Sequence, residues 1–210
     1  MNRDIARILL NLGAVSLRVD PPFTWASGRL SPIYCDNRLI ISCPKSRKIV
    51  ANGFKTLIEE KGLNPEVIAG TATAGIPHAA WLADLTALPM VYVRGSAKTH
   101  GKENRVEGKL SAGNSVLLIE DLISTGGSSV AAAEGLRNAG AEVVGIAAIF
   151  TYGLESARKR FEKARIPVFA LTSFDILTEE AARTGRLGPS DLETLAEWQR
   201  DPVLWSEKRR

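Results

Sequence analysis

Short apolar runs alternate with amphipathic stretches along most of the chain. Five runs, bounded by polar or glycine-containing turns, predict buried strands, and the stretches between them repeat apolar residues at helical spacing. Such repeated alternation is typical of an α/β fold with a central, mostly parallel sheet flanked by helices. The expected strands are residues 67–71, 90–94, 115–121, 143–150 and 168–174.

The helices expected between these strands have recognisable ends. Residues 42–62 carry Pro44 in the first turn and Gly62 as a stop, with an apolar face made of Ile49, Val50, Phe54, Leu57 and Ile58. Other helices are expected over residues 3–15, 75–87, 128–140, 153–164 and 177–185. The chain has no internal repeat, linker or change of composition, so residues 1–210 are expected to form a single domain.

One long segment fits neither pattern. Residues 95–111 are polar and charged, and they connect two strong strand candidates. A long connection of this kind in a compact domain is more often functional than idle. Two interpretations stay open: a loop that closes over a ligand with Gly95 and Gly101 as hinges, or a solvated hairpin.

Composition narrows the class of protein. Hydrophobic residues make up 45% of the chain and charged residues 24%, with a net charge of +4. This weak, dispersed charge suits anionic substrates and argues against nucleic-acid binding. No stretch approaches the roughly 18 apolar residues of a membrane span, and the charged N-terminus is unlike a signal peptide. Cys35 and Cys43 form neither a metal spacing nor a disulfide framework, so a cytoplasmic location is expected.

Candidate chemistry is concentrated in residues 116–129, VLLIEDLISTGGSS. Here a buried strand ends on Glu120 and Asp121, and ligands of open parallel sheets lie beyond the carboxyl ends of strands. At such an end the two carboxylates need not be buried among apolar side chains. They offer only acceptors, which suits the vicinal hydroxyls of a sugar.

A phosphate site is predicted a few residues later. Gly126 and Gly127 at an expected helix start let backbone N–H groups approach an anion, which the helix dipole also attracts. Further donor hydroxyls come from Ser124, Thr125, Ser128 and Ser129. A ribose 5-phosphate would satisfy the acidic pair and this cradle together. The alternative is a tight turn capped by Ser128. The glycine patterns of dinucleotide-binding folds and of P-loop NTPases are missing from the sequence.

Four segments together resemble a known family. VLLIEDLISTGGSS resembles the phosphoribosyl-diphosphate-binding signature of type I phosphoribosyltransferases, and residues 23–38, 70–83 and 93–108 are similar to orotate phosphoribosyltransferases in order and spacing. The resemblance implies the type I phosphoribosyltransferase fold, with a small N-terminal hood over about residues 1–40 and a long flexible loop. It implies transfer of ribose 5-phosphate from 5-phosphoribosyl 1-diphosphate to orotate, giving orotidine 5'-monophosphate and diphosphate in de novo pyrimidine (UMP) biosynthesis.

The resemblance also implies roles for single residues. The diphosphate is expected to bind Thr71, Ala72, Thr73, Ala74 and Gly75 together with Arg94, Lys98 and His100. The ribose is expected to bind Glu120 and Asp121, and the 5-phosphate Leu122, Ile123, Ser124, Thr125, Gly126, Gly127 and Ser128. Orotate is expected to contact Ser124 and the backbone near Tyr34 and Cys35. The catalytic residues are expected to be Lys98, His100 and Asp121.

The chain departs from the family pattern at three positions. Many members have lysine where this chain has Ala26, Ala74 and Gly95, so Lys98 is expected to carry more of the diphosphate contact. The cation that pairs with the orotate carboxylate is left open between Arg38 and Arg29. Trp25 is left open between stacking on the base and core packing, whereas His78 is expected to pack or cap.

A cofactor and an assembly are also implied by the resemblance. Mg²⁺ is expected, bound mainly through diphosphate and ribose oxygens rather than by protein ligands. A homodimer is expected in which the 95–111 loop closes over the partner's site.

Two other functions are left open by the sequence: the same transfer to another base, and a non-catalytic sensor of phosphoribosyl diphosphate. Residues 27–38 favour orotate, and the loop residues Lys98 and His100 argue against a sensor.

Overall fold

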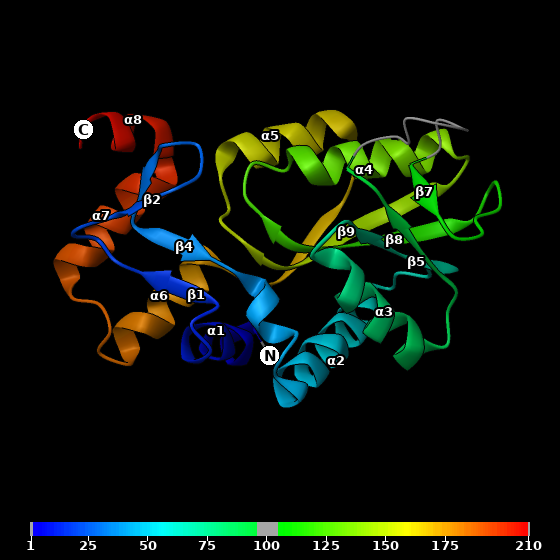
Figure 1. Cartoon of the computed structure of the whole chain (residues 1–210), viewed down its shortest axis with the longest axis horizontal. Coiled ribbons are helices and arrows are strands. Elements are labelled where there is room, and N and C mark those ends of the chain that lie inside the picture. The colour runs from blue at the N-terminus through cyan, green and yellow to red at the C-terminus, as the bar shows by residue number, and fades with distance from the viewer. Residues whose placement is uncertain (1, 96–104, 210) are drawn as a thin grey trace.

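A six-stranded sheet forms the centre of the molecule (Figure 1), in the order β10-β9-β8-β5-β6-β7. The structure is a computed structural model that describes residues 2–95 and 105–209. All neighbouring strands pair in parallel except β6 and β7. The five predicted strands are all present, so the mostly parallel α/β fold is confirmed. The strands of this sheet are β5 (Val67–Thr71), β6 (Met90–Val93), β7 (Val106–Glu107), β8 (Ser115–Ile123), β9 (Glu142–Thr151) and β10 (Val168–Ser173).

Helices cover both faces of this sheet. Below it in Figure 1 lie α2 (Pro44–Glu60) and α3 (Gly75–Thr86), and above it lie α4 (Gly127–Asn138) and α5 (Glu155–Ala164). Because successive strand residues point to opposite faces, β8 supplies Leu117 to one apolar core and Leu118 to the other. The chain thus buries both faces of its central strand, which explains the uninterrupted apolar run before Glu120.

The buried face of α2 differs in one residue from its prediction. Val50, Phe54 and Leu57 are buried and Ile58 is half-buried, but Ile49 is 36% exposed. Ile49 directly precedes Val50, so it lies about 100° away around the helix, at the edge of the apolar face.

A smaller lobe stands beside the carboxyl end of β8 and is built from both ends of the chain (Figure 1). Its strands pair as two antiparallel ribbons, β1 with β4 and β2 with β3. Trp198 of α7 is fully buried between these strands and the sheet, where its ring meets those of Trp25 and Tyr152. The lobe consists of α1 (Asn2–Asn11), β1 (Val15–Leu17), β2 (Phe23–Thr24), β3 (Leu30–Ser31), β4 (Ile33–Cys35), the 3₁₀ helix η1 (Asn37–Ile40), α6 (Phe174–Arg183), α7 (Pro189–Arg200) and α8 (Pro202–Glu207).

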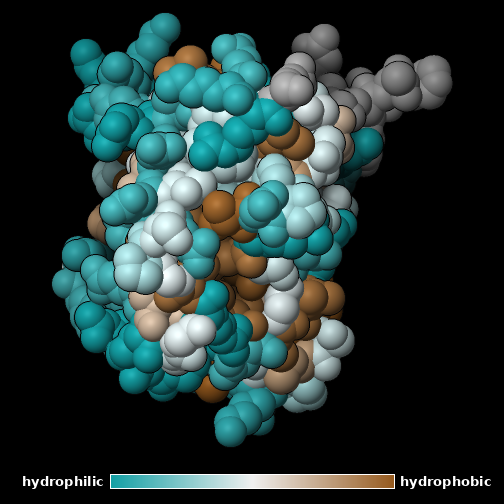
Figure 2. All heavy atoms as spheres, turned by 90° about the vertical axis from the view of Figure 1, so that its left-hand side faces the viewer, coloured by the Kyte–Doolittle hydropathy of each residue, from teal (hydrophilic) through white to brown (hydrophobic). Residues whose placement is uncertain are grey.

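Figure 2 looks onto the side of the molecule formed by this lobe. Apolar side chains gather across the middle of that face, with hydrophilic side chains around them. Among the described residues no helix is both long and apolar enough to cross a membrane.

The two ends of the 95–111 segment form a hairpin. β7 pairs antiparallel with β6, and the Arg94 backbone N–H donates to the Arg105 carbonyl oxygen at 2.8 Å. This pairing of the ends is compatible with both interpretations of the segment. Lys98, His100 and Gly101 lie outside the described residues, so the closing-loop interpretation stays a prediction.

Candidate active site

Three connections converge at one edge of the central sheet. β8, β5 and β6 are parallel neighbours, so the segments that follow their carboxyl ends lie side by side. These segments are residues 71–75 after β5, Arg94 after β6 and residues 124–128 after β8. The Ala72 N–H donates to the Val93 carbonyl oxygen at 2.9 Å, which ties the first connection to the second.

The start of α3 packs directly on β8. A Cβ atom added to Gly75 would lie 2.5 Å from the carbonyl oxygen of Ile119, so only glycine fits this approach. Pairing between β5 and β8 ends at the Gly70–Ile119 pair, beyond which β8 continues to Ile123 beside β9. Thr73 is exposed and Ala72 and Ala74 are half-buried, so this connection lies at the surface of the sheet edge.

The predicted phosphate cradle lies at the first turn of α4. Gly126 has φ +76°, a conformation that favours glycine, and α4 begins at Gly127 without a side-chain cap. The alternative of a turn capped by Ser128 is therefore wrong. Thr125 and Ser128 are exposed beside the first turn of α4, whose backbone N–H groups have no partner within the helix. This arrangement suits an anion.

Ser129 does not belong to this cradle, contrary to the prediction. Its side chain is fully buried, and Oγ donates to Oε2 of Glu120 at 2.9 Å. The turn of α4 carries Ser129 inward while Ser128 points out, a difference that the run of two serines cannot reveal.

Glu120 is buried, although its place at a strand end meant that its carboxylate need not lie among apolar side chains. It is 4% exposed, because β8 runs on to Ile123 and α4 covers it. Burial, followed by the charge of Asp121, raises the pKa of Glu120 to about 8. Burial also raises the pKa of Asp121, and a hydrogen bond with Glu120 partly offsets that rise. Burial therefore favours the protonated form of Glu120, and Asp121 is the better charged acceptor.

Asp121 faces the small lobe. Nδ2 of Asn37, a residue that is 1% exposed, donates to the Asp121 carbonyl oxygen at 2.7 Å. Among the described residues the amide oxygen of Asn37 has no partner. The pKa of Asp121 is raised by burial, and the charge of Arg38 only partly opposes that rise. Burial, followed by the charge of Asp121, raises the pKa of the Cys35 thiol. The structure thus brings the predicted base-binding segment to the predicted ribose-binding acid.

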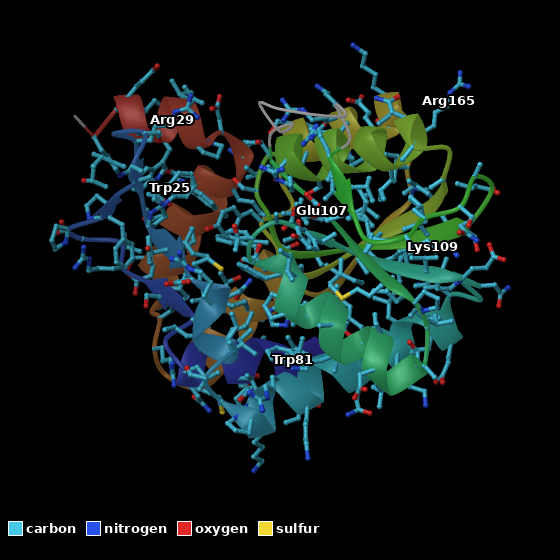
Figure 3. All side chains as sticks on the ribbon, turned by 45° about the vertical axis from the view of Figure 1, so that its right-hand side comes forward. Trp25, Arg29, Trp81, Glu107, Lys109 and Arg165 are labelled. Atoms are coloured by element: carbon cyan, nitrogen blue, oxygen red, sulfur yellow. The ribbon has the colours of Figure 1, made fainter. Side chains whose placement is uncertain are left out.

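The two candidate partners of the orotate carboxylate lie in different places. Arg38 is in η1, next to Asn37, and its Nη2 lies 3.0 Å from Oδ2 of Asp36. Arg29 lies beside α8 at the outer end of the small lobe (Figure 3). Tyr34 is 44% exposed on β4 and Cys35 is half-buried. Of the two arginines, Arg38 is the one next to the acid pair.

Arg94 is paired with a carboxylate on the neighbouring strand. Its Nη1 lies 3.6 Å from Oε1 of Glu107 on β7, across the hairpin. Figure 3 shows Glu107 beside the central strands, near the middle of the view. Diphosphate would have to share Arg94 with this carboxylate. Lys98 and His100, the other predicted diphosphate ligands, lie outside the described residues.

Trp25, which the sequence left open, and His78, which was expected to pack or cap, both pack against other aromatic rings. Trp25 lies flat against Tyr152, with ring centroids 6.0 Å apart, and Nε1 donates to the Ile33 carbonyl oxygen at 3.1 Å. His78 is buried and meets the ring of Trp81 edge-on, and burial lowers its pKa to about 4. The packing role predicted for His78 is confirmed.

Three residues of this site were missed from the sequence. Asn37 holds the Asp121 backbone, Glu107 pairs with Arg94, and Arg160 of α5 donates from Nη1 to the Thr125 carbonyl oxygen at 3.1 Å. Asn37 lies within residues 27–38, the segment that suggested base binding. The only sequence signal for its role was that it is a polar residue next to Asp36. No sequence signal distinguished Arg160 from the other basic residues of its helix.

Comparisons with known proteins agree on one family. The profile of the phosphoribosyl transferase domain matches residues 40–174. The orotate phosphoribosyltransferase of Fusobacterium nucleatum subsp. nucleatum is 54% identical over 201 residues, which cover 95% of each chain. The crystal structure of orotate phosphoribosyltransferase from Aeropyrum pernix has a TM-score of 0.75 and 28% identity over 88% of this chain and 99% of that one. The Mycobacterium tuberculosis enzyme in complex with 5-phospho-α-D-ribosyl 1-diphosphate, at 21% identity over 84% of this chain and 98% of that one, shares the fold with a TM-score of 0.67.

Proposed function

The chain belongs to the orotate phosphoribosyltransferase family, and we propose that it transfers ribose 5-phosphate from 5-phosphoribosyl 1-diphosphate to orotate in pyrimidine biosynthesis. The observation that carries this proposal is the order of three sites along one sheet edge. The open start of α4 would take the 5-phosphate, Asp121 the ribose hydroxyls, and residues 71–75 with Arg94 the diphosphate. The three groups occur in the same order in the substrate.

The charged side chains of the site would complement the charges that develop on the substrate during the transfer. As the bond from the anomeric carbon to diphosphate breaks, positive charge develops on the ribose and negative charge on the leaving group. Asp121 lies where it would face the ribose, and Arg94, with Lys98 and His100, would meet the diphosphate. Orotate carries its own nucleophilic ring nitrogen, so the protein needs no nucleophile. Its task is to orient the two substrates and exclude water.

The site fits a Mg²⁺ ion that arrives with the substrate. Within residues 2–95 and 105–209, no group of three or more His, Cys, Asp or Glu side chains could hold a metal. The carboxylate of Asp121 is the protein oxygen at hand, since Glu120 is buried, and Mg²⁺ in nucleotide-type sites commonly takes one or two carboxylates with substrate oxygens. When bound, it would neutralise charge on the leaving diphosphate.

The proposal includes the base site, the assembly and the location of the protein. Arg38 would pair with the orotate carboxylate, since it lies in η1 next to Asn37, which contacts Asp121. Ser124 and the backbone near Tyr34 and Cys35 would frame the ring. The protein would act in the cytoplasm as a homodimer in which residues 95–111 of one subunit close over the partner's site.

The base preference is the direct test of this function. We expect orotate to be used far better than uracil, adenine or hypoxanthine, because the carboxylate of an anionic ring suits the positive charge of Arg38 near Asp121. Product formation with each base, at equal concentration and with 5-phosphoribosyl 1-diphosphate and Mg²⁺, measures this preference. Faster use of any of the other three bases would reject orotate as the substrate.

The sugar site is tested by Asp121→Asn. This change keeps the side-chain size but removes a charge-assisted acceptor for a ribose hydroxyl, so binding of 5-phosphoribosyl 1-diphosphate should weaken by about 1.5–3 kcal/mol. Calorimetry measures the affinity, and Asp84→Asn, an exposed change on α3, is the control. Equal affinities of the two variants would remove Asp121 from the site.

A further inference from the structure

Helix α5 supports the outer side of the phosphate cradle at two successive glycines. A Cβ atom added to Gly126 would lie 2.7 Å from Cζ of Phe161, and one added to Gly127 would lie 2.7 Å from Nη1 of Arg160. The same Nη1 atom donates to the Thr125 carbonyl oxygen at 3.1 Å. The ring of Phe161 and the guanidinium of Arg160 therefore leave no room for a Cβ atom at these two positions. A larger residue at either glycine would have to displace them.

Arg160 differs from the neighbouring basic residues of α5 because those residues form ion pairs with carboxylates. Arg158 pairs with Glu155 and Glu162, and Lys159 pairs with Glu155. No ion pair joins Arg160 to any carboxylate within the described ranges; its hydrogen bond goes to a carbonyl oxygen, which leaves the positive charge uncompensated. This charge lies against the first residue of α4, where the helix dipole is also positive.

We propose that Arg160 is a positioning residue for the 5-phosphate. Its hydrogen bond to Thr125 fixes the carbonyl side of the cradle, so that the N–H groups of the first turn of α4 point outward. Its charge adds to the dipole of α4 and favours the dianionic form of the phosphate. This inference rests on the proposed function, because it takes residues 124–128 as the seat of the 5-phosphate.

Arginine suits both parts of this role. It stays charged at every physiological pH, and its planar fork can donate to a carbonyl oxygen while further N–H groups remain available to an anion. Arg160 itself is exposed, so its charge costs little desolvation in the absence of ligand. A residue that only held the loop in place would not need a charge.

The test compares three variants in α5. Arg160→Met keeps the aliphatic stem but removes the charge and the donors, whereas Arg160→Lys keeps the charge. Arg158→Met removes an arginine of the same helix whose partners are Glu155 and Glu162, and serves as the matched control. The ligands are ribose 5-phosphate, followed by calorimetry and by ³¹P NMR from pH 5 to 8, and 5-phosphoribosyl 1-diphosphate in the transferase assay.

We expect Arg160→Met to weaken ribose 5-phosphate binding about 10-fold at pH 7.5, the size of effect that loss of one charge-assisted contact gives. The loss should be smaller at pH 5.5, because the second pKa of a phosphate monoester is about 6 and the monoanion depends less on a nearby cation. The ³¹P titration of the bound phosphate should move to higher pH. The KM for 5-phosphoribosyl 1-diphosphate should rise while kcat changes less than about twofold. Arg160→Lys should regain most of the affinity, and Arg158→Met should match the wild type.

Other outcomes separate this inference from the proposed function. If the wild type binds ribose 5-phosphate and Arg160→Met binds it equally well, Arg160 has no role at the phosphate and the proposed function stands. A loss that is equal at both pH values and that lysine does not restore means that Arg160 only packs, which also overturns the inference. If the wild type neither binds ribose 5-phosphate nor catalyses the transfer, the proposed function fails, and this assignment falls with it.

Discussion

At pH 9 the Glu120→Gln variant is expected to unfold with a free energy up to about 5 kcal/mol larger than that of the wild type, whereas at pH 5 the two should differ by only about 1 kcal/mol. The folded protein raises the pKa of Glu120 from 4.5 to about 8, chiefly by burial. The folded state therefore binds this proton more tightly than the unfolded state, and stability is lost as pH rises from 4.5 through 8. Glutamine is neutral at every pH and escapes this loss.

The substitution keeps the local contacts of the side chain. The amide oxygen of glutamine can accept from the Asp121 N–H, as Oε1 does now, and its NH₂ group can donate to the hydroxyl of Ser129, which donates and accepts equally well. Urea unfolding without ligand, at fixed protein concentration and at pH 5, 7 and 9, measures the effect. Glu134→Gln, on the exposed side of α4, is the control. Parallel pH profiles of the wild type and Glu120→Gln would show that Glu120 is already ionised at neutral pH.

The central sheet could be predicted because its strands are buried on both faces. Runs such as residues 67–71 and 143–150 contain almost no polar residue, and each lies between glycine, proline or charged turns, so length and composition alone locate them. The sequence also predicts that three connections meet, since the carboxyl ends of parallel strands share one edge. These connections are residues 71–75, Arg94 and residues 124–128.

The small lobe could not be predicted in the same way. β2 and β3 have two residues each, too few for any periodicity, and they depend on pairing and on contact with α7 and α8 at the other end of the chain. The raised pKa of Glu120 and the contacts of Asn37 and Arg160 have a similar origin. Asn37 meets Asp121 across 84 residues and Arg160 meets Thr125 across 35, and such contacts arise only when separate elements pack. Local sequence gives the donors and acceptors, but the partner is set by the fold.

Lys98→Ala is expected to lower turnover by roughly 10²–10³, the usual cost of removing one preorganised group that stabilises charge in the transition state. The expectation is large because Ala26, Ala74 and Gly95 supply no cation, and Arg94 already shares its charge with Glu107. The kcat at saturating substrates measures the loss. Lys109→Ala, an exposed change just beyond β7, is the control and should stay close to wild type. A Lys98→Ala enzyme of normal turnover would leave the departing diphosphate to Arg94 and His100.

The same variant tests whether two subunits share a site. Asp121→Asn damages the subunit that carries it, whereas Lys98→Ala should damage the partner's site if residues 95–111 reach across a symmetric interface. When the two inactive proteins are mixed and their subunits exchange at random, half of the dimers are heterodimers, and each of these has one site with both lesions and one intact site. Activity at low substrate should therefore recover to roughly a quarter of the wild-type value. If Lys98 serves its own subunit, every site keeps one lesion, so subunit exchange seen by mass spectrometry without recovered activity would exclude the shared site.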